Sequence, residues 1–134
     1  MNRAILCLML VVASTGLSAA SHTEKLMAEL YANYPHKNSP EASVYRGGIV
    51  FSHYCALCHG VKADGNGRTA KMYDPRPANL TTSDKNDDYK ELIVRQGGAA
   101  LGRSQFMPPW GGELTDEQIR DVIAFLRSIQ QKNP

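Results

Sequence analysis

Apolar residues recur three or four positions apart in several stretches of the chain, a spacing that predicts amphipathic helices. The first stretch ends at Pro35 and contains Leu26, Met27, Leu30, Tyr31 and Tyr34. The second begins at Ser39, a favourable N-cap residue, followed by Pro40 at the first helical position. We therefore predict an N-terminal extension, residues 21–38, with one short amphipathic helix, and a longer helix that leads from Ser39 to Cys55.

The middle of the chain combines irregular segments with one predicted helix. Residues 60–87 contain several glycines and prolines and show little strand alternation, so they are predicted to form a long loop. The helix that follows has either Asp87 or Asp88 as its N-cap, and Gly97 is expected to end it as the C′ residue. A second segment rich in glycine and proline separates this helix from the last one.

The last helix has the clearest start signal in the chain. Thr115 and Gln118 fit a capping box, in which each side chain bonds the backbone N–H of the other residue. A continuous apolar stripe follows, made of Ile119, Val122, Ile123, Leu126 and Ile129. The predicted fold is therefore all-α, with residues 39–134 forming one domain of helices joined by long loops.

The first twenty residues have the pattern of a secretory signal peptide. Arg3 provides the positive start, residues 4–13 are apolar, and Ser18, Ala19 and Ala20 resemble a cleavage site. The apolar run is shorter than the roughly 20 residues of a membrane span. We expect export to the periplasm, cleavage before Ser21, and no stable membrane span after cleavage. An uncleaved anchor is the alternative.

Composition narrows the classes of function. The 134 residues suit one domain, and a formal net charge of +2 lacks the dense Lys and Arg stripe of a nucleic-acid groove. No nucleic-acid partner is therefore expected. Three cysteines cannot pair into a disulfide framework, and Cys7 would leave with the signal peptide. Cys55 and Cys58 remain.

The segment Cys55-Ala56-Leu57-Cys58-His59 has the C-x-x-C-H pattern of c-type haem attachment. Two thiols one helical turn apart can add to the two vinyl groups of haem, and the adjacent imidazole of His59 can bind the iron. The alternatives are a redox dithiol, which needs a βαβ context, and a zinc site, which needs a fourth ligand. We therefore predict one covalent haem c, with His59 as a metal ligand.

Three further segments accompany this motif. They read GVKADGNG at residues 60–67, PRPANL at 75–80 and MPPWG at 107–111. In this order they resemble the class I c-type cytochromes over roughly residues 43–130, and in particular a bacterial subgroup that includes haem subunits of high-affinity terminal oxidases. The resemblance implies a small cytochrome c-like helical bundle around one haem, with single-electron transfer as the function. It does not extend to residues 21–38.

Met107 is the candidate for the sixth iron ligand, because a soft thioether suits haem iron and the ligand must reach the opposite haem face. Pro108 and Pro109 restrict the backbone around it. The rival is Met72, which lies only thirteen residues beyond His59. We predict that Met107 and His59 are the two metal ligands.

Three more residues are predicted to contact the cofactor. In the resembling family a proline carbonyl accepts the hydrogen bond of the ligating histidine, and Pro77 is the matching position, with Pro75 as the second candidate. Arg76 lies near a haem propionate or is solvated. The Trp110 indole reaches a propionate or packs against the haem edge.

Gly47, Phe51 and Cys55 are spaced by four and lie near one face of their helix. A glycine there lets another helix approach closely. In the resembling family the first and last helices cross at this point, so Phe125 is the expected aromatic partner on the last helix.

Two functions follow from these predictions. The first is a periplasmic electron carrier whose iron cycles between Fe(II) and Fe(III) with both axial positions filled, exchanging electrons with an oxidase, reductase or dehydrogenase, either free or as a complex subunit. The second is a haem enzyme or gas sensor with an open sixth position. The segment around Met107 offers no histidine or carboxylate before Glu113 that could act on bound peroxide, which favours the carrier.

Overall fold

The computed structural model describes residues 22, 24–29 and 37–131, which belong to two units, Met1–Asn33 and Tyr34–Pro134. In the first unit, residues 22 and 24–29 are helical, and Leu26 is exposed. The predictions for residues 1–20 and for Leu30, Tyr31, Tyr34 and Pro35 lie outside the described residues.

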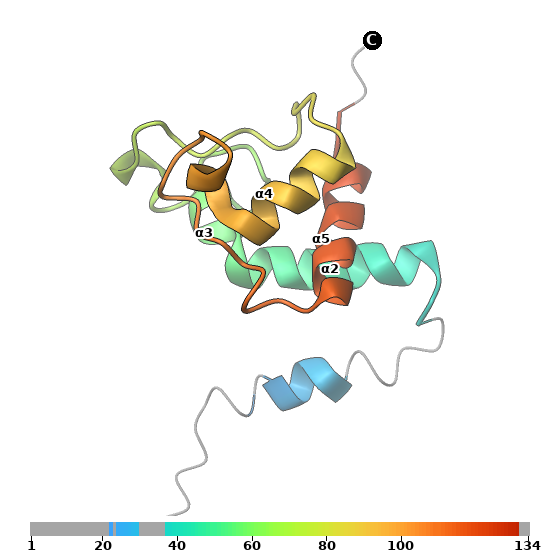
Figure 1. The fold of residues 1–134 in the computed structure, drawn as a ribbon. Coiled ribbons are helices and arrows are strands. Elements are labelled where there is room, and N and C mark those ends of the chain that lie inside the picture. Colours follow the sequence, from blue (N-terminus) through green and yellow to red (C-terminus); the bar gives the residue numbers. More distant parts are fainter. Residues whose placement is uncertain (1–21, 23, 30–36, 132–134) are drawn as a thin grey trace, which may run out of the picture. The chain divides into compact units, whose positions relative to one another are not determined.

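The second unit is built from helices and long loops (Figure 1). Its elements are α2 (Pro40–Tyr54), α3 (Ala56–His59), the 3-10 turn η1 (Ala70–Met72), α4 (Asp87–Ala100) and α5 (Asp116–Ser128). No strand occurs in the described part of the chain, which confirms the predicted all-α class. Of the helices that the structure describes, none has the length and apolar character to cross a membrane.

Side-chain caps set the starts of α2 and α5 as predicted. The Ala42 N–H donates to Ser39 Oγ at 3.1 Å, and Pro40 occupies the first turn. At α5 the Gln118 N–H donates to Thr115 Oγ1 at 3.2 Å, and the Thr115 N–H donates to Gln118 Oε1 at 2.9 Å. Both starts are local in sequence, so neither needs the tertiary fold.

The predicted N-cap of α4 at Asp87 or Asp88 is wrong. The N-cap is Asn86, whose Oδ1 accepts from the Tyr89 N–H at 2.9 Å. The two aspartates lie in the first turn instead, where negative charge is favourable at a helix N-terminus. Asparagine and aspartate cap about equally well, so residue type alone does not select the start.

The crossing of α2 and α5 forms the centre of the fold. A Cβ on Gly47 would lie 1.9 Å from Asp121 O and 2.9 Å from Phe125 Cβ, so only glycine allows this approach. The rings of Phe51 and Phe125 are 5.2 Å apart, which confirms Phe125 as the aromatic partner. The core around the crossing consists of Val50, Phe51, Ala63, Val94, Leu114, Ile119, Val122, Ile123 and Leu126.

A buried ion pair that no local sequence pattern predicts also joins the two helices. Arg46 Nε and Nη2 donate to the Asp121 carboxylate at 2.7 and 3.0 Å, and the two side chains are 6% and 3% exposed. Ser43 Oγ donates to Asp121 Oδ1 at 2.6 Å, and Arg46 Nη1 donates to the Lys37 carbonyl. The charges are therefore paired and further hydrogen-bonded within the crossing.

Alanine substitutions at Gly47 and Gly48 are expected to have opposite effects on the free energy of unfolding. Gly47→Ala would force the helix backbones apart and is expected to lower it by about 1–3 kcal/mol. Gly48→Ala meets only the Phe125 ring, 3.4 Å away, and is expected to raise it by about 0.5–1 kcal/mol, because alanine is the better helix former. Denaturant unfolding followed by circular dichroism measures both. Equal effects would contradict the close crossing.

Candidate functional site

The C-x-x-C-H segment lies where α2 ends and α3 begins. Cys55 is the C-cap of α2 and the N-cap of α3, and its N–H donates to the Phe51 carbonyl at 2.9 Å. Cys58 and His59 occupy α3. Both thiols are free and partly buried, and Cys58 Sγ lies 3.5 Å from Thr69 Oγ1. The two thiols thus remain separate groups, each able to form its own thioether.

The chemistry of Cys55 differs from that of a redox dithiol. Burial, followed by the negative charge of a Cys58 thiolate, raises the pKa of Cys55 to about 12. Reactive thiols in redox motifs have a lowered pKa and are thiolates near neutral pH. Cys55 therefore stays protonated there and is not itself an activated thiol. The described residues also contain no strand, so the βαβ context of a redox dithiol is missing.

His59 is oriented by a backbone carbonyl. Its Nδ1 lies 3.0 Å from the Ala78 oxygen. Because a carbonyl only accepts, Nδ1 carries the proton and Nε2 keeps a free lone pair. Burial lowers the pKa of His59 below its usual value, and the bond to Ala78 opposes this in part. The imidazole is therefore neutral at neutral pH, the state that a metal ligand requires.

The assignment of Pro77, or Pro75, as the acceptor is wrong by one or three positions. The Leu80 N–H donates to the Ala63 carbonyl at 2.8 Å and sets the register of this segment. A Cβ on Gly65 would lie 2.5 Å from the Pro77 oxygen and 3.3 Å from the Ala78 oxygen, so both carbonyls lie beside the loop that follows His59. Of the two, the Ala78 carbonyl is the one that accepts from His59.

The segment that carries Met107 is held along the end of α4. Gly97 interrupts this helix at the predicted position with φ 78°, and one further turn follows. A Cβ there would lie 2.9 Å from Met107 O. The Gly98 N–H donates to the Met107 carbonyl at 2.9 Å, and the Trp110 N–H donates to the Val94 carbonyl at 2.9 Å. The backbone on both sides of Met107 is therefore fixed.

The two candidate methionines lie in different surroundings. Met107 is partly buried and packs against the core. Met72 lies on η1 with 75% of its surface exposed. Met107 therefore has the environment expected of a ligand inside the fold, whereas Met72 has that of a surface side chain.

The residues present fit a covalently attached haem. Several apolar side chains pack against the core yet keep part of their surface uncovered, and they are Cys55, Ala56, Leu80, Met107 and Trp110. They come from the segment with the two thiols, from the loop beside His59 and from the segment after α4. A flat apolar group with thioether links at Cys55 and Cys58 would cover such a surface, and His59 Nε2 is available to its iron.

The predicted roles of Arg76 and Trp110 stay predictions. Arg76 is exposed. Trp110 is partly buried, and its ring meets that of Tyr54 edge-on, with centroids 5.3 Å apart. Both positions are compatible with the predicted contacts to a haem propionate or to the haem edge.

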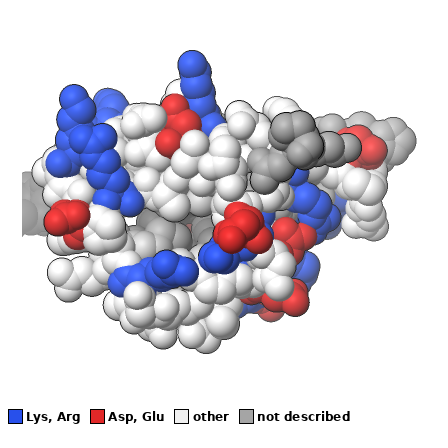
Figure 2. All heavy atoms as spheres, turned by 90° about the horizontal axis from the view of Figure 1, so that it is seen from above, with Lys and Arg blue, Asp and Glu red and all other residues white. Residues whose placement is uncertain are grey.

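Charged residues of both signs lie on the loops near the Cys55–His59 and Met107 segments. The exposed cations of the loops are Lys62, Arg68, Lys71, Arg76 and Arg103. Figure 2 shows Lys and Arg side chains on a hollowed face with Asp and Glu side chains between them. Asp64 is one acidic residue of these loops, and its bonds to Asn66 lower the pKa of its carboxyl group.

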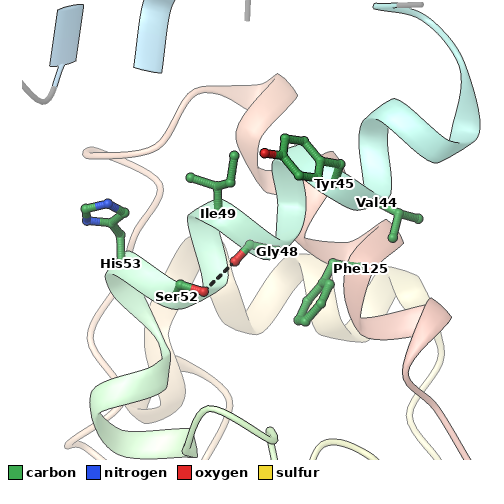
Figure 3. Close-up of a pocket in the computed structure, with 7 residues that line it drawn as sticks. All are labelled: Val44, Tyr45, Gly48, Ile49, Ser52, His53 and Phe125. Atoms are coloured by element: carbon green, nitrogen blue, oxygen red, sulfur yellow. Dashed lines mark hydrogen bonds between the residues drawn. The ribbon is translucent and has the colours of Figure 1, made fainter. Parts of the chain in front are cut away.

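A separate groove of about 530 Å³ lies on α2 and involves none of the predicted ligands (Figure 3). Its lining residues are Val44, Tyr45, Gly48, Ile49, Ser52, His53 and Phe125. His53 is exposed. Within residues 22, 24–29 and 37–131, no three His, Cys, Asp or Glu side chains are grouped to hold a metal ion.

Comparisons with known proteins agree with this geometry. A family model described as cytochrome C oxidase, cbb3-type, subunit III matches residues 42–126, more than half of the chain. Among solved structures, a chain of the Kuenenia stuttgartiensis reducing HAO-like protein complex is similar, with a TM-score of 0.54 and 30% identity. The match covers 63% of this chain and 41% of that one, so this chain spans less than half of that protein. No curated protein matches the sequence significantly.

Proposed function

Because this chain belongs to the family of the cytochrome c oxidase, cbb3-type, subunit III, we propose that it carries single electrons between redox proteins through one covalently bound haem c. Haem-based electron transfer follows from the family. The number of haems, the ligand set and the location are the finer parts of the proposal.

The observation that carries the proposal is the arrangement around His59. Its Nδ1–H donates to the Ala78 carbonyl, which fixes the tautomer and leaves Nε2 for the iron. Such a bond orients the ring and makes it a stronger ligand. Cys55 and Cys58, free and one helical turn apart, supply the thioether links.

Met107 is proposed as the sixth ligand. Its backbone is fixed to α4 through Gly98, and its side chain packs against the core. A bound haem c supplies an iron that accepts and releases one electron. His59 and Met107 would hold the iron, and apolar side chains such as Leu80 and Trp110 would cover the ring, which would leave no place on the metal for water, O₂ or peroxide. No substrate bond is made or broken.

The proposed location is the periplasm, supported by the signal-peptide pattern of residues 1–20. The proposed partners are redox proteins. A similar chain occurs in a HAO-like protein complex, which supports a role beside other redox proteins without identifying them.

The test is an absorption spectrum of the protein matured with haem, recorded oxidised and reduced and then with carbon monoxide added. We expect a low-spin c-type spectrum, the weak red band of Met bound to ferric iron, and no change with carbon monoxide. A high-spin spectrum or a carbon monoxide response would mean that the sixth position is open, and the enzyme or sensor alternative would replace the carrier.

A further inference from the structure

Met107 lies between two aromatic residues, and each of them pairs with a tyrosine on the side of the chain that carries the C-x-x-C-H segment. Phe106 directly precedes Met107, and its ring lies 5.1 Å from that of Tyr73, at an angle of 37°. Trp110 follows three residues later and meets Tyr54 at 5.3 Å and 70°. Tyr54 directly precedes Cys55, and Tyr73 directly follows η1.

Three of these four rings lie outside the core, while Trp110 packs against it. Phe106 is 46% exposed and Tyr54 is 38% exposed, and neither they nor Tyr73 belongs to the cluster around the crossing of α2 and α5. Both pairs have geometries in which aromatic rings attract each other beyond the gain from buried area.

The backbone hydrogen bonds around Met107 connect its segment to α4 and not to the segment that carries His59. The Gly98 and Trp110 N–H groups connect this segment to α4, which lies after the loop of residues 60–86 in the chain. Those bonds hold Met107 relative to α4 but do not link it to the side that carries His59. The Tyr73–Phe106 and Tyr54–Trp110 contacts make that link, one on each side of Met107.

We infer that the two ring pairs form an aromatic clasp, Tyr54–Trp110 and Tyr73–Phe106, that keeps the Met107 thioether opposite His59 and resists its displacement by other ligands. The four are positioning residues, since they act through Met107. The inference rests on the proposed function, because it needs Met107 as the sixth ligand. It predicts that loosening the clasp makes the iron accessible without removing any ligand.

The test is a double-mutant cycle read out by imidazole binding to the ferric, haem-loaded protein. Tyr73→Leu and Phe106→Leu should each raise the imidazole binding constant about two- to tenfold, the range that corresponds to one aromatic pair. The double variant should bind no more tightly than the stronger single variant, since the pair is already broken. Tyr54→Leu and Trp110→Leu form the second cycle, with the same expectation.

Control variants separate the clasp from general destabilisation. Tyr73→Phe and Phe106→Tyr keep the rings and should bind imidazole as the unaltered protein does. Tyr45→Leu should also leave imidazole binding unchanged, because it removes an exposed tyrosine that lines the separate groove of Figure 3. The clasp would be overturned if the single variants bound imidazole no more tightly than the unaltered protein, or if their effects multiplied in the double variant. In either case the red absorption band of the unaltered protein would still support Met107 as a ligand. An unaltered protein without that band would overturn the proposed function and the clasp with it.

Discussion

Replacing Asp121 by alanine is expected to lower the free energy of unfolding by about 3 kcal/mol, because the Arg46 guanidinium stays charged and buried and keeps only the partly exposed Glu117 carboxylate, 3.5 Å away, in place of its 2.7 Å partner. Ser43 Oγ would lose its acceptor at the same time. The loss is large since the Arg46 side chain is only 6% exposed, so water solvates the remaining charge poorly. Denaturant unfolding of the haem-loaded protein, followed by circular dichroism, measures the change.

Two variants serve as controls for this prediction. Arg127→Ala removes an ion pair with Asp87 in which the arginine is 64% exposed, and it should cost less than about 1 kcal/mol. Arg46→Met combined with Asp121→Leu removes both buried charges and should be much less harmful than Asp121→Ala. A cost near that of Arg127→Ala for the single variant would contradict the burial of the pair.

Met107→Ala is expected to abolish the weak red band of the ferric protein completely and to make the ferrous protein bind carbon monoxide. Alanine has no donor atom, and the bonds made by the Gly98 and Trp110 N–H groups keep the backbone of this segment in place. The reduction potential should fall, because a Met/His pair raises it. Absorption spectra and a redox titration measure these changes.

Met72→Ala is the matched control. It also replaces a methionine by alanine, but at a side chain that is 75% exposed on η1. Its spectrum, potential and response to carbon monoxide should equal those of the unaltered protein. If Met72→Ala removed the band and Met107→Ala kept it, the ligand assignment would be reversed.

Features within a few residues of each other were predictable from the sequence. The spacing of Cys55, Cys58 and His59 places them within one turn, with Cys55 as the N-cap of α3 and the other two on it, because covalent geometry fixes distances over one turn. The capping box of Thr115 and Gln118 is equally local. Gly47 could be assigned to a helix crossing because a glycine in a helix costs stability and therefore indicates a close contact.

Features that depend on the direction of a backbone group needed the folded chain. Ala78 and Pro77 are neighbours with equally capable carbonyls, and only the register set by the Leu80–Ala63 bond decides which one faces His59. The cap of α4 is similar, since Asn86 and the two aspartates after it have comparable preferences.

By itself, then, the sequence determined the all-helical class, the haem-attachment segment and the order of the motifs, because each rests on spacing along the chain. Only the tertiary structure decided the long-range pairings. Arg46 and Asp121 are 75 positions apart, and no periodicity relates them. Tyr73 and Phe106 likewise meet only because the chain brings their two segments together. Such contacts depend on the path of the whole backbone, which local propensities do not encode.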